Sequence, residues 1–389
     1  MRIVDIRERT VAISRYADAA LPSGGLTTSI VALVTDVVRN GRPIIGYGFS
    51  SFGRFGQGGL INERFAPRIL NAPEAALVAE DGTNIDPFRV WEVMMSGEKP
   101  GGHGERCVAV GTLDMAVWDA AAKIADLPLH RFLSDRIGPG AAGESQVAVY
   151  AGGGYRYPSD DIPRLTEEIR RFLDLGYTRV KIKIGTDPVS QELARMEAAL
   201  ALLPSAQNLA VDAMNAFDRR RCLEVGAVLA PYRLWWFEDV CDPLDFETLG
   251  ELAGTYRPPI AAGESLFSLA EARLLNRHGG LRPGRDILQF DPVHCYGLPE
   301  YLRILDALEA EGWPRRAFWP HGGHLFSLHI AHALGLGGSE VNPLCFQPFG
   351  GLADDAMVVE GSAGLPAGPG IGFEAKAGAM EAFRALSNR

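Results

Sequence analysis

Cysteine is scarce in this sequence. The 389 residues include five cysteines, an odd number, and no two of them form a Cys-x-x-Cys pair. This argues against a disulfide framework and against a structural zinc cluster, and reduced thiols fit a cytoplasmic protein. Histidine is also sparse, with eight residues and no His-x-His pair. A barrel of the zinc hydrolase type is therefore disfavoured.

Positive charge and long apolar runs are lacking as well. Lys and Arg number 38 against 48 Asp and Glu, so the net charge is −10, which disfavours a nucleic-acid surface. No apolar run approaches the roughly 20 residues that span a membrane. Asp5, Arg7 and Glu8 interrupt the stretch where a signal peptide would be apolar. We expect a cytoplasmic protein with a small-molecule substrate and with no membrane or nucleic-acid partner.

The first 130 residues carry the signals of an α+β domain. An apolar run over Ser29–Val38, an Asn40-Gly41 turn and a return over Ile44–Tyr47 predict a hairpin, and one more strand is expected before it. A helix is predicted over Val108–Lys123, because its apolar and small residues continue until Pro128 disfavours further helix. We assign residues 1–130 to a capping domain.

From about Gln146 short apolar runs alternate with amphipathic helical patterns, which is typical of parallel strands joined by helices. Eight such runs predict an α/β fold, a (β/α)8-type or modified TIM barrel, in residues 131–350. The Gly- and Pro-rich residues 351–389 hold no further unit and are expected to return to the capping domain. The predicted strands are Gln146–Tyr150, Arg179–Ile184, Asn208–Asp212, Leu234–Glu238, Pro259–Glu264, Asp286–Asp291, Ala317–His321 and Gly338–Val341.

Four consecutive runs end in a carboxylate, namely Asp212, Glu238, Glu264 and Asp291, at separations of 26, 26 and 27 residues. One β/α unit has about that length, so the acids would occupy the ends of neighbouring strands, roughly 4.8 Å apart. Crowded carboxylates need a compensating charge, and Mg²⁺ prefers oxygen ligands. Three acids suffice, which leaves the fourth another role. The alternative is that each acid caps the following helix.

Two further patterns supply candidate bases. Lys181 and Lys183 share one face of an alternating strand, and an inward, partly desolvated lysine beside another cation has a lowered pKa that suits a general base. A solvated edge strand is the alternative. His321 ends the seventh run, opposite the second strand, and Asp291 can hydrogen-bond its ring. The histidines beyond it are interpreted as core or surface residues: His324, His329 and His332.

The sequence resembles the enolase superfamily, mandelate racemase subgroup, over nearly its whole length. The helix motif Leu113–Asp119, followed by Lys123 and Leu127–Leu129, is similar to the end of the capping domain in that family, and Lys181-Ile-Lys183 to its Lys-x-Lys motif. The resemblance implies one Mg²⁺ per subunit held by Asp212, Glu238 and Glu264. It further implies Lys183 as base, His321 with Asp291 as a second pair, and Lys181 and Glu340 beside the substrate carboxylate.

The resemblance also implies a reaction. The family abstracts a proton next to a carboxylate, giving an enediolate that the metal stabilises. If His321 returns the proton to the other face, the outcome is racemisation or epimerisation of a 2-hydroxy acid; if it protonates a β-hydroxyl, the outcome is dehydration. Because the subgroup contains many acid-sugar dehydratases, we expect a hydro-lyase. A barrel that only binds is disfavoured because every catalytic position is filled. The family forms dimers and octamers, so a homo-oligomer is expected.

One motif departs from the family pattern Asp-x-Asn. Asp212 is followed by Ala213, Met214 and Asn215, so either the loop holds an extra residue or Asn215 has lost a substrate contact.

Segments 21–28 and 49–59 are expected to close over the barrel and select the substrate. Their polar character, with cations nearby, favours a hydroxylated substrate or one with a second acidic group and disfavours an aromatic one; surface exposure is the alternative for the cations. The candidate residues are Ser23, Ser50, Ser51, Arg54 and Gln57, with Tyr47 just before and with Lys99 and His103 from the loop 97–104.

Overall fold

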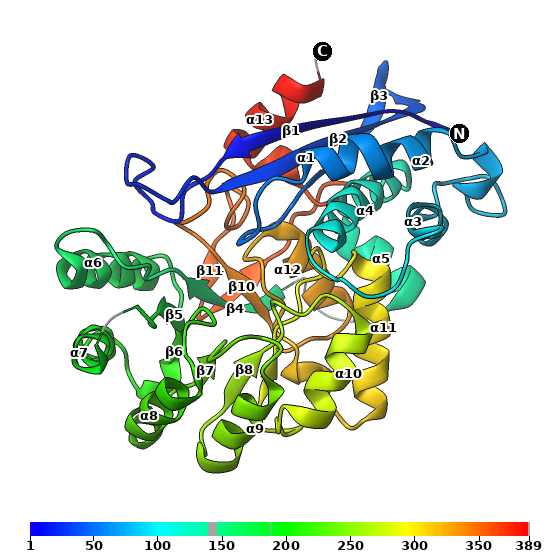
Figure 1. The fold of residues 1–389 in the computed structure, drawn as a ribbon. Helices are drawn as coiled ribbons and strands as arrows, with labels where there is room; N and C mark the ends of the chain where they lie inside the picture. Colours follow the sequence, from blue (N-terminus) through cyan, green and yellow to red (C-terminus); the bar gives the residue numbers. More distant parts are fainter. Residues whose placement is uncertain (139–145, 187, 388–389) are drawn as a thin grey trace.

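The computed structural model describes residues 1–138, 146–186 and 188–387. An antiparallel sheet with its helices lies at one end of a ring of parallel strands (Figure 1). This is the predicted arrangement of a modified TIM barrel with an α+β cap. Among the described helices, none is long and apolar enough to cross a membrane. All five cysteines are buried free thiols.

The cap is built on three antiparallel strands, β1 (Ile3–Ala12), β2 (Thr27–Arg39) and β3 (Arg42–Phe49), in that spatial order. Asn40 and Gly41 connect β2 to β3 with φ of 52° and 75°, which confirms the predicted hairpin turn. Helix α4 (Glu105–Ile124) packs closely on β3, because a Cβ on Gly46 would lie 2.0 Å from the Ala116 carbonyl oxygen. The remaining helices of this part are α1 (Gly58–Leu60), the π-helix η1 (Ile61–Phe65), α2 (Ala66–Leu70), the 3-10 helix η2 (Glu74–Ala76), α3 (Pro87–Met95) and α5 (Leu129–Ile137).

Parallel strands form the ring, and from β4 to β9 each pairs with the next. They are β4 (Gln146–Gly152), β5 (Val180–Lys183), β6 (Leu209–Asp212), β7 (Trp236–Glu238), β8 (Ile260–Ala262), β9 (Ile287–Leu288) and β10 (Ser339–Val341). Strand β10 pairs in parallel with β4 on the far side of the ring.

The predicted seventh strand, 317–321, is wrong. Its first residue, Ala317, belongs to the 3-10 helix η5 (Arg315–Ala317), and after it a single parallel bridge joins Phe318 to Leu288. Pro320 has no N–H to extend a ladder. The extended chain still spans the gap in the ring, since Trp319 N donates to the Leu288 carbonyl at 2.9 Å and Gly337 N to the Phe318 carbonyl at 3.0 Å.

Helices surround the ring (Figure 1). Helices α8 (Arg219–Leu229) and α9 (Phe246–Thr255) each have their own capping residue: the Asp218 carboxylate accepts from Arg221 N–H, and the Asp245 carboxylate accepts from Thr248 N–H. The strand-end acids Asp212 and Glu238 are therefore not the caps of α8 and α9, and the alternative role considered for them is wrong. The surrounding elements are α6 (Asp161–Asp174), α7 (Val189–Leu200), η3 (Ala206–Asn208), α8 (Arg219–Leu229), η4 (Ala230–Tyr232), α9 (Phe246–Thr255), α10 (Leu269–His278), α11 (Leu298–Ala310) and α12 (Leu325–Ala333).

The C-terminal segment returns to the cap, as predicted. Its strands β11 (Val358–Val359) and β12 (Ser362–Gly364) form a hairpin that pairs antiparallel with β4 of the barrel. The 3-10 helix η6 (Phe373–Ala375) and α13 (Ala377–Ser387) follow, and α13 lies beside the cap sheet (Figure 1). The buried Asp119 of α4 joins the parts, because its carboxylate accepts from Tyr47 N at 2.8 Å and from Ile371 N at 2.7 Å. The Phe383 ring stacks on Tyr47 with centroids 4.7 Å apart.

Candidate active site

Three carboxylates meet at the carboxyl ends of neighbouring strands. In the parallel register Lys183 pairs with Asp212, and Asp212 with Glu238. Glu264 follows the end of β8 by two residues. One oxygen from each of Asp212, Glu238 and Glu264 lies within 4.8 Å of the others. The predicted spacing therefore does place these three acids together.

Two lysines of β5 compensate part of this charge. Lys181 Nζ lies 2.5 Å from Glu238 Oε1, 3.1 Å from Glu340 Oε1 and 3.7 Å from Asp212 Oδ2. Lys183 Nζ bonds Asp212 Oδ2. Burial alone would lower the pKa of both lysines, but the carboxylates outweigh it and raise both pKa values. The predicted lowered lysine pKa is therefore wrong for this arrangement, because Asp212, Glu238 and Glu340 lie within ion-pair distance of the lysines.

Glu238 is fixed by two side chains, Trp236 of its own strand β7 and Gln289, which directly follows β9. Trp236 Nε1 donates to Glu238 Oε2 at 2.7 Å, and Gln289 Nε2 donates to the same oxygen at 2.9 Å. Each donor stands two residues before a strand-end acid, so alternation along the strand could have identified both. Burial raises the pKa of Glu238 to about 8, against the pull of Lys181. At Asp212 burial would raise the pKa, but the charges of Lys183 and Lys181 together with the hydrogen bonds from Lys183 and Met214 N outweigh it and lower the pKa to about 2.

The carboxylate cluster fits a metal ion. Glu264 Oε2 is buried and has no hydrogen-bond partner, although His321 Nε2 lies 3.5 Å away. The two lysines contact Asp212 and Glu238 but not this oxygen. Three carboxylates that share two lysines, with one oxygen unbonded, are a ligand set for a hard divalent cation. Asp212, Glu238 and Glu264 can therefore hold such an ion.

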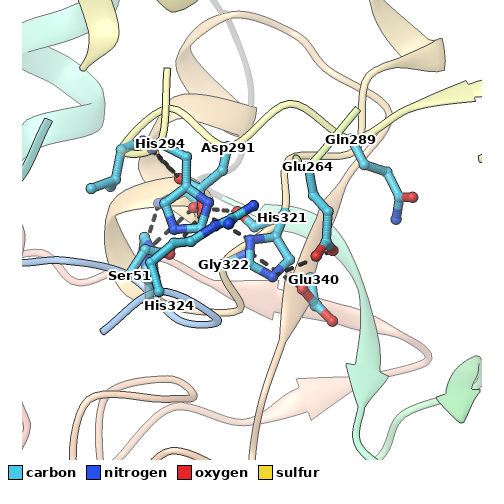
Figure 2. A network of polar contacts seen from close by, with 12 residues as sticks. Ser51, Glu264, Gln289, Asp291, His294, His321, Gly322, His324 and Glu340 are labelled. Carbon is cyan, nitrogen blue, oxygen red and sulfur yellow. Dashed lines mark hydrogen bonds and ion pairs between the residues drawn. The ribbon is translucent and has the colours of Figure 1, made fainter. Parts of the chain in front are cut away.

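His321 lies beside the cluster, bonded to Asp291 (Figure 2). The distance from His321 Nδ1 to Asp291 Oδ2 is 2.8 Å. Burial opposes the charged ring, but Glu264 and the bond to Asp291 outweigh it and raise the pKa of His321 to about 9. An imidazolium at neutral pH can donate a proton. The pKa of Asp291 is lowered, because the neighbouring histidines outweigh its burial.

A serine and a second histidine support this pair, and the sequence analysis missed their role. Ser51 Oγ, from the segment after β3, donates to Asp291 Oδ2 at 2.7 Å. His324 Nε2 lies 3.1 Å from the same hydroxyl (Figure 2). Ser51 was predicted to select the substrate and His324 to be a core or surface residue. No sequence signal could reveal the contact, because the two residues are 273 positions apart.

Arg54 and Glu340 also lie near the cluster. Arg54 Nη2 donates to Ser265 Oγ at 3.2 Å, one residue beyond Glu264, and its guanidinium lies 4.7 Å from the Phe267 ring centroid. Glu340, in β10, accepts from Gly322 N at 3.3 Å besides pairing with Lys181. The capping segment thus supplies one cation beside the candidate site.

Two further predicted substrate residues, Tyr47 and Asn215, have contacts with groups outside the carboxylate cluster, and Lys99 is exposed; their substrate roles stay predictions. Tyr47 packs on α13 and under Lys123, whose Nζ is 4.5 Å from its ring centroid. Lys99 is exposed and has no hydrogen bond or ion pair within the described part of the chain. Asn215 donates its amide to the Cys241 carbonyl at 2.8 Å, and Met214 and Asn215 both have left-handed φ, 50° and 57°. This turn directs the asparagine to the neighbouring loop.

The other polar candidates of the cap also bond locally. Ser23 bonds Arg15, Ser50 bonds Thr112, Gln57 bonds Glu105 and His103 bonds Tyr296.

Residues 164–379, more than half of the chain, match the family described as Enolase C-terminal domain-like. The chain belongs to the enolase superfamily. Among curated relatives of this superfamily member, the L-talarate/galactarate dehydratase of Salmonella typhimurium is 29% identical over 78% of this chain and 71% of its own. The arabinonate dehydratase of Saccharolobus solfataricus is 24% identical over 95% of both chains.

Solved structures share the fold of this enolase superfamily member. A racemase from Streptomyces coelicolor with bound magnesium superposes with a TM-score of 0.77 at 21% identity, covering 99% of both chains. The L-talarate dehydratase of Polaromonas, complexed with Mg and L-glucarate, superposes with a TM-score of 0.73 at 24% identity, covering 97% of both chains. The predicted modified TIM barrel with its cap is confirmed.

Proposed function

We propose that this enolase superfamily member is a Mg²⁺-dependent acid-sugar dehydratase, and that its substrate is D-tartrate, converted to oxaloacetate and water. The main support for this proposal is that two side chains able to transfer protons contact different members of one carboxylate cluster. Lys183 bonds Asp212, whereas His321 lies 3.5 Å from Glu264. The curated relatives named above are dehydratases of acid sugars, which supports the reaction class.

Asp212, Glu238 and Glu264 would hold the Mg²⁺ ion. When bound, the ion supplies positive charge where negative charge develops on the substrate carboxylate. Lys181 adds a second, fixed cation for that carboxylate, since Glu238 and Glu340 position its ammonium from two sides. These groups would make a weakly acidic α-proton removable.

Lys183 would take the α-proton onto Nζ, which requires its neutral amine. Burial and the neighbouring Lys181 both favour that form, and the nearby groups, Asp212 foremost, oppose it. Compensation of the Asp212 charge therefore frees Lys183 to act as a base.

His321 would act as the acid. Its imidazolium would give the Nε2 proton to the β-hydroxyl, which leaves as water, and the enol product would tautomerise to the keto acid. Asp291 accepts from Nδ1 and so keeps Nε2 as the donating atom.

A cation near the cluster and the expected stereochemistry both favour D-tartrate. Arg54, beside Ser265, offers a cation for a second carboxylate of a short substrate. The family resemblance implies that Lys183 acts on S-configured α-carbons, and D-tartrate is 2S,3S.

A library of acid sugars, assayed for keto-acid product with Mg²⁺, tests this proposal. We expect turnover of D-tartrate and a loss of about 1000-fold in Lys183→Ala, in the range that a general base contributes. If the wild-type protein turned over D-tartrate no faster than Lys183→Ala, the assignment would fail.

A dehydratase of a longer aldonate or aldarate is the second candidate, favoured by the arabinonate and talarate/galactarate relatives. The same library separates it by a faster rate on the longer acids. A racemase or epimerase of a 2-hydroxy acid would instead incorporate solvent deuterium without releasing water.

A further inference from the structure

His294 is a buried histidine that makes no side-chain hydrogen bond. It lies in the segment between β9 and α11, three residues after Asp291, and its side chain is 3% exposed. Neither Nδ1 nor Nε2 has a hydrogen-bond partner. Buried polar atoms are bonded in most proteins, so this ring needs an explanation. By contrast, the buried His329 bonds at both nitrogens, to His130 N and to the Ile371 carbonyl.

The ring lies beside Asp291 and His321, whose side chains are of types that can ligate a metal (Figure 2). Asp291 Oδ2 is 3.7 Å from His294 Nδ1 and 2.8 Å from His321 Nδ1. The two imidazole centroids are 5.5 Å apart, and one ligand atom from each of the three residues lies within 4.8 Å of the others. The ligand atoms of a tetrahedral zinc ion lie about 3.3 Å apart. The distances from Asp291 Oδ2 to the two histidine nitrogens, 2.8 Å and 3.7 Å, lie on either side of that value.

We propose that Asp291, His294 and His321 form a second metal site, which binds a zinc-type transition ion rather than Mg²⁺. Two imidazoles and one carboxylate are a donor set that Zn²⁺ and Co²⁺ accept, whereas Mg²⁺ prefers oxygen ligands alone. The cluster of Asp212, Glu238 and Glu264 offers only oxygen. The two clusters therefore select different ions.

Binding of a transition ion has a consequence for the proposed reaction. The ion would occupy His321 and Asp291, the pair assigned to proton donation, so Zn²⁺ would inhibit the Mg²⁺-loaded enzyme. This consequence rests on the proposed function, but the binding itself does not. Ion binding is therefore tested separately from turnover, and a negative result in one assay does not decide the other.

Co²⁺ absorption tests the binding directly. The full-length protein is titrated with Co²⁺ in saturating Mg²⁺, and we expect a visible d–d band of a four- or five-coordinate ion that Zn²⁺ bleaches. The band should be absent from His294→Leu, from the similarly sized His294→Gln and from Asp291→Asn. It should remain in the control His278→Leu, since His278 is exposed at the end of α10. Circular dichroism verifies that each variant is folded.

A folded wild-type protein without the band would overturn the proposal, as would an unchanged band in folded His294→Gln. In the kinetic arm, the Zn²⁺ concentration for half-inhibition should rise at least about tenfold in His294→Gln, with the Mg²⁺-only rate unchanged. An unchanged half-inhibition constant would contradict the site. If D-tartrate is not turned over at all, the Co²⁺ titration still decides.

Discussion

Asp291 is the residue that connects the cap to the candidate acid. Its carboxylate accepts from Ser51 of the cap segment, from Val293 N at 2.7 Å and from His321. Hydrogen bonds to an ionised group are stronger than neutral ones, and they fix the direction of the carboxylate. The orientation of His321 therefore depends on a loop more than 200 residues away in sequence.

Replacement of Ser51 measures that dependence. A hydrogen bond to a charged group contributes about 1.5–3 kcal/mol, so Ser51→Ala should lower kcat by roughly 10- to 100-fold, with little change in KM. Ser50→Ala is the matched control, because Ser50 bonds Thr112 rather than the site. Steady-state kinetics measures both variants, and an unchanged kcat in Ser51→Ala would show that the contact does not position the acid.

At the scale of elements, α4 joins the cap to the barrel through backbone contact. A Cβ on Gly111 would lie 1.8 Å from the Val293 carbonyl oxygen, two residues after Asp291. Close approach of the helix to this segment therefore requires glycine.

Gly111→Ala should destabilise the protein, although alanine favours a helix by about 1 kcal/mol over glycine. The clash would also displace the segment of Asp291, so kcat should fall. Gly254→Ala in α9 is the control, since nothing lies within 4 Å of its added Cβ, and it should be neutral or stabilising. Urea unfolding gives the free energies; equal effects of both substitutions would contradict this account of α4.

Helices α5 and α12 meet at buried histidines, which predicts a pH effect. Burial lowers the pKa of His329 to about 3, whereas an unfolded histidine titrates near 6.5. As pH falls below about 6.5, the unfolded state binds a proton that the native state does not. The free energy of unfolding therefore decreases as the pH falls from about 6.5 towards 3, and it decreases by about 2 kcal/mol between pH 7 and pH 5. In urea unfolding, the free energy of unfolding of His329→Gln should drop by about 2 kcal/mol less than that of the wild type between pH 7 and pH 5. An equal drop in both proteins would exclude His329 as the cause.

Local patterns predicted most elements and the main cluster. The hairpin and α4 followed from turn residues and apolar periodicity, and Asp212, Glu238 and Glu264 from the regular spacing of strand ends. The seventh strand was predicted from an apolar run alone, although Pro320 within that run lacks the N–H that a ladder needs. The predicted direction of the lysine pKa shift was wrong because it depends on the distances from the lysines to acids in other strands.

Over the whole molecule the net charge is −10, but the buried acids of the candidate site are paired with cations. Acids concentrated at the carboxyl ends of the strands are compensated by Lys181, Lys183 and His321. The contacts of Tyr47 and Asn215 could not be predicted, because they depend on other segments: the Phe383 ring stacks on Tyr47, and Asn215 donates to the Cys241 carbonyl. The cytoplasmic location, the dimer or octamer and the domain limits stay predictions.

The central claim is that Lys183 removes the α-proton and His321 donates a proton in a separate step. Proton NMR of D-tartrate in deuterated water with Mg²⁺ measures both events, as loss of the α-proton signal and as formation of oxaloacetate. The account predicts that His321→Asn exchanges the α-proton but forms no product, and that Lys183→Ala does neither. Loss of both events in folded His321→Asn, or exchange in Lys183→Ala, would contradict it.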